Sequence, residues 1–416
     1  MKKTDRKTIM TGIGGILCII GLAAWAYQLL GKGMAMTDLR NIFSWGLYMG
    51  SFEFFIALSS GGMLLFSICY IWKVASLKPY TRVASIASFA SVIAAGVAIM
   101  EDLGYPLHSV HMLLHPNLYS PLMWDVAVLG IYAILTLIAM LLQLVPGAKR
   151  FRDRRNVRLD CELYSAKLSY FALPFVVILN LVTSLMFATQ NTREWWHSAL
   201  IPVNAVAEAF AVGLAFMLLL AAILSPKGGM QVWGEGLRRI ARYTGWAILA
   251  YLIFTAVEMV TLAWNHSAET RELLHLVTGT YGLLFWLQIL LPLTAMIGFF
   301  AVRRPGRKVY GILSVFVMIG IFIQRMMLLL PAFNAVPMTL QINGAESSLW
   351  TYPVALGIFE PGEKVFATFW NYTPTPLEWC AAMLPVGIVI LAIALGVKFF
   401  PLIPHTWEKQ VIEEEK

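Results

Sequence analysis

Long apolar stretches alternate with short polar connections along almost the whole chain. A helix needs about 20 predominantly apolar residues to cross the hydrocarbon core of a bilayer. Ten stretches of that length can be counted, over residues 9–30, 43–72, 83–104, 123–145, 169–189, 200–224, 243–264, 280–302, 309–331 and 379–400. The pattern predicts an all-α, polytopic membrane protein with about ten transmembrane helices.

Composition supports this prediction, because 59% of the 416 residues are hydrophobic and only 13% are charged. Basic residues accumulate in cytoplasmic connections. If the N-terminus lies inside, the inside segments hold most of the 31 Lys and Arg residues, and the outside segments hold only Lys32, Arg40, Arg193, Arg271 and Lys364. We therefore expect both termini to be cytoplasmic and the chain to span the inner membrane. The net charge of +8 then reflects topology rather than nucleic-acid binding.

The order of the stretches suggests a modular organisation. We expect a first helix with its outer loop (1–42), a first four-helix bundle (43–189), a second four-helix bundle (190–331), a long outer loop (332–378), and a last helix with a cytoplasmic tail (379–416). The helix count is compatible with two duplicated bundles but does not demonstrate duplication. The loop 332–378 is too long for a bare connection.

Ionisable residues within the spans are costly in a bilayer and suggest function. Counted from the outer ends of the predicted helices, all of them lie in the outer half or at the outer rim: Glu53, Glu208, Glu258, Arg325, Asp102, Asp125 and Glu378. A structural alternative is that Glu258 and Arg325 form a buried ion pair that joins two helices. For Trp195 and Trp196, beside the predicted sixth helix, an interfacial aromatic belt is expected.

Histidine and cysteine positions argue against metal cofactors in this chain. A transmembrane haem needs axial histidines that face each other within helices. The seven histidines fall instead in predicted loops, at helix ends or in the tail, namely His108, His111, His115, His197, His266, His275 and His405. The four cysteines are scattered and show no CxxC spacing. The sequence therefore predicts no haem, no Fe–S cluster and no other metal site.

One segment carries a family resemblance. Residues 101–125, EDLGYPLHSVHMLLHPNLYSPLMWD, resemble the DLGRP, HLL and SPMSWD pattern of membrane subunits in the polysulfide reductase/NrfD family. The stretches FSWGLYMGSFEFF, REWWHSALIPVNAVAEAFAVG, QRMMLLLPAFN and YTPTPLEW are similar to the ten-helix branch that includes the quinone-linked membrane subunit of a periplasmic hydrogenase. Tyr105 departs from the pattern, because the family usually has Arg there.

The resemblance implies a membrane anchor subunit of a respiratory oxidoreductase complex, with two four-helix bundles and flanking helices. It implies that menaquinol or another quinone binds at the outer side as a substrate, while the chain has no redox cofactor of its own. The expected partners are a ferredoxin-like Fe–S subunit on the outer face and a further subunit, such as a molybdopterin enzyme, a hydrogenase or a multihaem cytochrome c. Proton translocation is an additional possibility.

Candidate site residues follow from this resemblance and from the position of the charges. The outer end of the first bundle is expected to hold the quinone between Asn41, Trp45, Tyr48, Asp102 and His111. Asp102 is the first choice for the proton acceptor, because a carboxylate within reach of a quinol hydroxyl can act as a general base. A proton path is expected along Glu53, Glu208, Glu258 and Arg325.

Two other readings remain open from the sequence. A secondary transporter or proton channel would also carry buried Glu and Arg residues in two related bundles. Helices broken in matching positions would favour the transporter, and the sequence shows no convincing pair. A chain that only tethers a partner would leave the charges within the spans unexplained.

Overall fold

The computed structural model describes residues 6–148, 154–224, 230–265, 267–301, 306–334, 337–340, 348–351, 354–357 and 365–400. Within these ranges, ten helical segments are long and apolar enough to cross a membrane, which confirms the predicted all-α class and number of spans. They are formed by α1 (Arg6–Leu30), α2 (Leu47–Ile71), α3 (Thr81–Asp102), α5 (Pro121–Leu144), α6 (Arg155–Ala188), α7 (Leu200–Leu224), α8 (Met230–Trp264), α10 (Gly282–Ala301), α11 (Arg307–Asn334), and α12 (Pro376–Ala381) with α13 (Met383–Phe399).

Short elements connect the spans. They are η1 (Gly33–Met36), η2 (Ala75–Tyr80), η3 (Pro106–His108), α4 (Ser109–Leu114), η4 (Val145–Gly147), α9 (Ala268–His275), the π-helical turn η5 (Leu276–Thr280), and the strands β1 (Pro337–Leu340), β2 (Ser348–Thr351), β3 (Val354–Ala355) and β4 (Phe366–Ala367). β1 pairs with β2 and β3 pairs with β4, both antiparallel. The histidines His266 and His405 lie outside the described residues.

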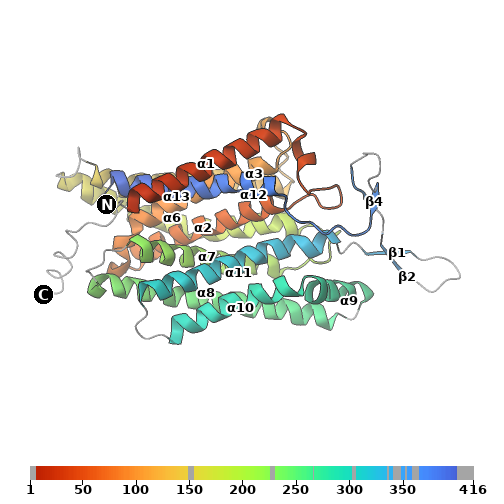
Figure 1. Ribbon diagram of the computed structural model, residues 1–416. Coiled ribbons are helices and arrows are strands. Elements are labelled where there is room, and N and C mark those ends of the chain that lie inside the picture. The colour runs from red at the N-terminus through yellow and green to blue at the C-terminus, as the bar shows by residue number, and fades with distance from the viewer. Residues whose placement is uncertain are drawn as a thin grey trace, which may run out of the picture.

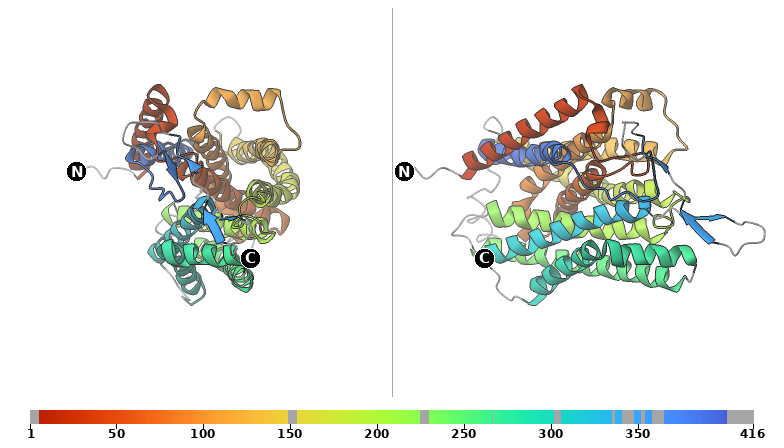
Figure 2. Two further views of the ribbon diagram at one scale, coloured as in Figure 1. Left: turned by 90° about the vertical axis from the view of Figure 1, so that its right-hand side faces the viewer. Right: turned by 45° about the vertical axis from the view of Figure 1, so that its right-hand side comes forward.

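The spans form two groups that meet along α2 and α7. In the first group α2, α3, α5 and α6 pack on one another, and in the second α7, α8, α10 and α11 do so (Figures 1 and 2). The two groups approach most closely at a pair of glycines. A Cβ atom on Gly61 of α2 would lie 2.0 Å from the carbonyl carbon of Gly213 of α7, so neither position has room for a side chain. Small residues of this kind allow helices to associate in lipid.

The first and last spans form a separate pair. α1 packs along α13, and α13 packs on α3. The contact again depends on small residues, since a Cβ on Gly21 would lie 2.4 Å from the backbone nitrogen of Leu384 and one on Gly387 would lie 2.7 Å from that of Cys18. This pair places the end of α1 and the start of α12 beside the first group.

Some helices differ in length from the sequence prediction. α6 begins at Arg155 and α8 at Met230, about four turns before the predicted apolar stretches. A helix satisfies its own backbone hydrogen bonds and can therefore continue beyond the hydrocarbon core. The last span is divided at Ala382 into α12 and α13. α12 starts with a capping box in which Thr375 and Glu378 bond to each other's backbone N–H groups.

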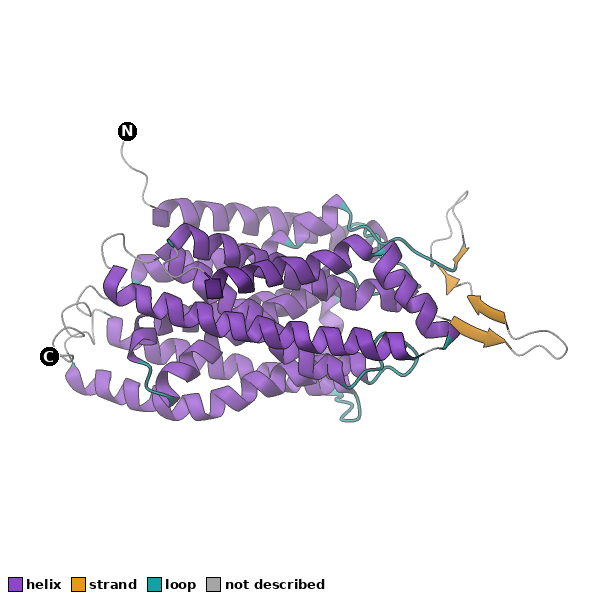
Figure 3. Cartoon of the chain, turned by 90° about the horizontal axis from the view of Figure 1, so that it is seen from below, coloured by secondary structure: helices purple, strands orange, loops and turns teal. Residues whose placement is uncertain are grey.

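We call the two ends of the molecule outer and inner, according to the orientation predicted from the basic residues. The four strands project from the outer end in Figures 1 and 3. η3 and α4 also lie at this end, crosswise to the spans in Figure 2. The start of α1 and the end of α13 lie together at the opposite, inner end (Figure 1).

Candidate functional site

A buried polar cluster, which we call the outer junction, lies where the outer ends of α1, α2, α3 and α12 meet. It consists of Gln28, Tyr48, Glu101, Asp102 and Glu378. The Tyr48 hydroxyl donates to Gln28 Oε1 at 2.7 Å, and the charges of Glu378, Glu101 and Asp102 all act on this hydroxyl. Tyr48 and Glu378 are fully buried. Three carboxyl groups therefore lie close enough to this phenol to influence it electrostatically.

Hydrogen bonds hold Glu378 in place. Its Oε1 accepts from the Tyr372 hydroxyl at 2.6 Å, and its Oε2 accepts from the backbone N–H groups of Asp38 and Thr375 at 3.0 and 2.8 Å. The Tyr372 hydroxyl also accepts from the backbone N–H of Leu47 at 2.9 Å. Burial, followed by the charge of Glu378, raises the pKa of Tyr372, so that this residue remains a neutral donor. Glu378 therefore has a structural role at the junction.

Glu101 and Asp102 differ from Glu378 because they lack such partners. Neither oxygen of the fully buried Glu101 carboxyl group has a hydrogen-bond partner among the described residues, and Asp102 Oδ1 has none either. A buried carboxyl group without a partner is costly unless it receives a proton or a hydrogen bond from another molecule. Asp102 was expected at the site from the sequence, whereas Glu101 was not. The spacing of Ala94, Ala98 and Glu101 on one buried face of α3 could have identified it.

The other predicted lining residues are not gathered at the junction. Asn41 is exposed and its backbone N–H donates to the carbonyl of Leu356 at 3.3 Å. His111 lies exposed on α4, where its ring contacts those of His108 and His115. Among the five predicted lining residues, the structure brings together only Tyr48 and Asp102.

Trp45 belongs to an aromatic cluster next to the junction. Its ring lies 5.6 Å from Phe187, 5.9 Å from Trp196 and 6.2 Å from Phe333, measured between ring centroids. Trp196 is only 3% exposed and donates to the Leu328 carbonyl at 2.7 Å. The neighbouring Trp195 donates to the Met327 carbonyl. The prediction of an interfacial belt is wrong for Trp196, which is buried inside the protein, and it stays a prediction for the half-buried Trp195.

A second charged cluster lies deeper, between the two groups of helices. Arg325 Nη1 of α11 lies 3.2 Å from Glu53 Oε2 of α2 and 3.2 Å from Glu208 Oε2 of α7. Gln324 donates to the other oxygen of Glu208 at 2.9 Å. The three charged side chains are at most 5% exposed. The structural alternative in which Arg325 pairs with Glu258 is wrong, since Arg325 is shared by two other carboxylates.

Glu258 instead faces a small cavity beside this cluster. The cavity has a volume of about 20 Å³ and is also lined by Glu208, Arg325, Gln324 and Asn204. A polar cavity of this size can hold a water molecule, which needs about 10–15 Å³. A single water could therefore connect Glu258 with Glu208, although the two side chains come from different helices.

The arrangement combines two kinds of chemistry. At the outer junction, Glu101 and Asp102 have carboxyl oxygens without a hydrogen-bond partner among the described residues, and these oxygens can accept hydrogen bonds or protons from a ligand. Deeper in the span, one guanidinium is shared by two carboxylates, so that a change in one pair alters the field at the other. The two clusters are both connected to α2, which carries Tyr48 and Glu53.

Comparisons with known proteins agree with this architecture. The family model described as "Polysulphide reductase, NrfD" matches residues 35–337. A Halobacterium salinarum protein, provisionally named as a membrane subunit of dimethyl sulfoxide reductase, is 28% identical over 94% of this chain and 90% of its own length. A selenate reductase subunit of Mesobacillus selenatarsenatis is 24% identical over 93% of this chain and 92% of its own length.

A third relative is the Hdr-like menaquinol oxidoreductase integral membrane subunit of Archaeoglobus fulgidus, which is 23% identical over 96% of this chain and 95% of its own length. The family match covers more than half of the chain, and the structure supplies ten segments capable of spanning a membrane. This multi-pass integral membrane protein therefore belongs to the polysulphide reductase/NrfD family.

Proposed function

We propose that the chain is the membrane anchor of a respiratory oxidoreductase complex and that it binds menaquinol or a related quinol at the outer junction. The observation that carries the proposal is the Glu101–Asp102 pair beside Tyr48, with buried carboxyl oxygens that have no partner among the described residues. A quinol offers two hydroxyl groups that such carboxylates can bind. The names of the relatives, which include a menaquinol oxidoreductase subunit, support the substrate class.

Oxidation of a quinol releases two protons and two electrons. In the proposed step, a quinol O–H bond breaks and a carboxyl O–H bond forms on Asp102 or Glu101, while Tyr48 orients the substrate oxygen. The sequence has no histidine pair within the spans and no cysteine cluster. We therefore expect the electrons to pass to an Fe–S cluster of a partner subunit on the outer face, with a molybdopterin enzyme, a hydrogenase or a multihaem cytochrome c as the further subunit.

The test uses the complex purified with its partners and a soluble menaquinol analogue. Replacing Asp102→Asn should slow quinol turnover about a hundredfold, the lower range for loss of a general base, while the same subunits copurify. Asp160→Asn, an identical change at an exposed inner position, is the matched control. Unchanged turnover of the assembled Asp102→Asn complex would remove this residue from the mechanism.

A second candidate function is proton transfer into the membrane, coupled to turnover. It is favoured by the cluster of Glu53, Arg325 and Glu208 and by the cavity that connects it with Glu258. In this proposal, protonation of Glu53 shifts Arg325 toward Glu208. When Glu53 loses that proton, Arg325 returns to it, and the Glu208 carboxylate accepts a proton from Glu258 through water. α2 contributes Tyr48 to the outer junction and Glu53 to this cluster, and this shared helix would couple quinol oxidation to proton transfer.

The transporter reading is less well supported. A transporter would use the charged cluster to bind a solute or an ion, whereas the junction would have no defined part. Proteoliposomes that contain the chain without its partners distinguish the two readings, because a transporter would move charge without quinol. Quinol-dependent charge movement only in the complete complex would support the anchor.

A further inference from the structure

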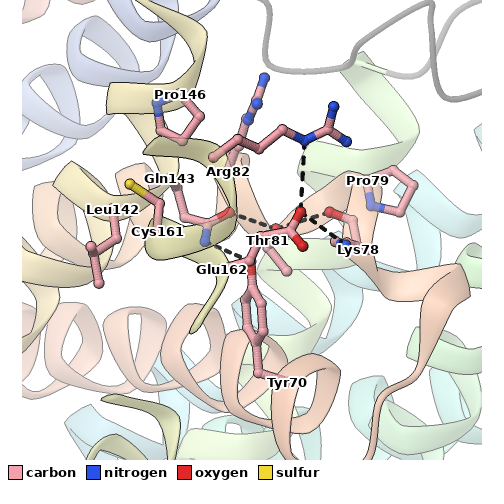
Figure 4. A pocket seen from close by; sticks show the side chains of 11 residues that line it. Tyr70, Lys78, Pro79, Thr81, Arg82, Leu142, Gln143, Pro146, Cys161 and Glu162 are labelled. Carbon is pink, nitrogen blue, oxygen red and sulfur yellow. Dashed lines mark hydrogen bonds and ion pairs between the residues drawn. The ribbon is translucent and has the colours of Figure 1, made fainter. Parts of the chain in front are cut away.

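A larger cavity lies at the inner end of the first group of helices, far from the site described above. It has a volume of about 50 Å³, and its walls come from the end of α2, from η2, from the start of α3, from the end of α5 and from the start of α6. Figure 4 shows that charged and polar side chains from these elements converge on it. The proposed function does not use this cavity.

The cavity has an excess of positive charge. Among the described residues, its lining includes three cations, Lys78, Arg82 and Arg158, and one carboxylate, Glu162. Glu162 lies 3.1 Å from Lys78 and 3.9 Å from Arg158, so two of the cations share the one anion. The described lining residues therefore carry a formal charge of +2, which favours an anionic ligand.

Neutral donors complete the polar lining. Gln143 Nε2 donates to the Tyr70 hydroxyl at 2.8 Å, and the Thr81 hydroxyl donates to Gln143 Oε1 at 2.9 Å (Figure 4). Gln143 is thereby fixed between α2 and α3, and it holds the Tyr70 hydroxyl at the cavity wall. A phosphate group is an anion that guanidinium and hydroxyl donors of this kind can bind.

An apolar groove lies on α3 and α5, which also line the cavity, and on α13. It has a volume of about 360 Å³ and is lined only by apolar side chains and a glycine of α3, α5 and α13, among them Ile86, Phe89, Leu144 and Phe399. Ile86 follows Arg82 by one turn on the same face of α3. Leu144 directly follows Gln143, which lines the cavity. The groove therefore starts within about one helical turn of the residues that line the cavity, although the two have no lining residue in common.

We propose that the cavity and the groove together bind one anionic phospholipid of the inner leaflet. The phosphate group would bind between Arg82 and Lys78, and one acyl chain would lie along the groove against α3 and α13. The combination of charge and apolar surface favours a lipid over a free anion, because a free phosphate would use only the cavity. Basic pockets between membrane helices are suited to anionic headgroups.

Retention of lipid by the purified, intact complex in detergent tests this proposal. Phosphatidylglycerol should bind the delipidated complex in mixed micelles, and phosphatidylcholine should not replace it. The double variant Lys78→Gln/Arg82→Gln should weaken phosphatidylglycerol binding about thirtyfold, or about fivefold for each charge. The control Arg155→Gln/Lys167→Gln removes two charges from exposed positions of α6 and should leave the affinity unchanged.

A variant in the groove separates a lipid from a free anion. Ala392→Phe of α13 fills part of the groove and should weaken phosphatidylglycerol binding without altering the cations. If Lys78→Gln/Arg82→Gln and the control Arg155→Gln/Lys167→Gln bound phosphatidylglycerol with equal affinity, the proposed site would be overturned. Two outcomes would overturn the lipid proposal. In one, inorganic phosphate alone displaces phosphatidylglycerol; in the other, Ala392→Phe binds phosphatidylglycerol with unchanged affinity. Either would show that the groove and the acyl chain do not contribute to binding.

Discussion

Arg325 and Glu53 form an ion pair at 3.2 Å across the boundary between the two groups of helices. The residues are 272 positions apart in the chain and both are at most 5% exposed. Because Glu208 binds the same guanidinium nitrogen, one side chain of α11 connects α2 with α7. This pairing makes the charged cluster a structural joint as well as a candidate for proton transfer.

Removing the cation should destabilise the protein strongly. Arg325→Gln leaves two buried carboxylates without their partner, which should lower the free energy of unfolding by about 3–5 kcal/mol. Chemical unfolding in detergent measures this value. Arg239→Gln, which breaks a surface pair with Glu235, should change it by about 1 kcal/mol or less. Similar losses in the two variants would contradict the central role of Arg325.

The glycine contact between α2 and α7 should tolerate no side chain. Gly213→Ala places a methyl group 2.5 Å from the backbone of Gly61 and should cost about 1–3 kcal/mol or more. Gly96→Ala on α3 is the control, because a Cβ there meets nothing within 4 Å. Thermal unfolding of both variants in the same detergent tests the contact, and equal melting temperatures would argue against it.

Tyr372 should contribute to stability through its hydroxyl group. Tyr372→Phe removes the donor to Glu378 and the acceptor for the Leu47 N–H. The buried groups left without a partner should cost about 1–3 kcal/mol. Tyr119→Phe, at a side chain that is 93% exposed, should have little effect. Thermal unfolding separates the two variants, and a stable Tyr372→Phe protein would show that the network can rearrange.

Glu101 should reveal a conflict between stability and activity. Glu101→Met replaces an unpartnered buried carboxyl group with an apolar side chain and should raise the free energy of unfolding by about 1–3 kcal/mol. Quinol turnover of the complex should fall about a hundredfold if this carboxylate accepts a proton. Measuring both quantities on one preparation is decisive, since higher stability with full turnover would assign Glu101 no part in the reaction.

Glu258 should affect proton movement more than quinol turnover. Glu258→Gln keeps the shape of the side chain but removes its proton acceptor at the cavity shared with Glu208. In proteoliposomes with the complete complex, the charge moved per quinol should fall while the turnover rate persists. Glu272→Gln, on the outer helix α9, is the control. An unchanged ratio of charge to turnover would exclude this path.

The sequence alone determined the membrane class, the ten spans and the family resemblance. These properties depend on local features, since apolar runs of sufficient length insert whichever helices they later contact. The segment that contains Asp102 was recognisable for the same reason, because its pattern is continuous in the chain. Placement of the buried charges in the outer half also followed from counting along single helices.

Only the tertiary structure decided which of these groups meet. An ion pair between Arg325 and Glu258 was one alternative from the sequence, but Arg325 pairs with Glu53 and Glu208. Glu101 proved to be fully buried beside the half-buried Asp102. Periodicity gives the face of a helix on which a residue lies, but not the neighbouring helix that this face contacts. That choice depends on close packing between distant segments, such as Gly61 against Gly213, and a single sequence does not record it.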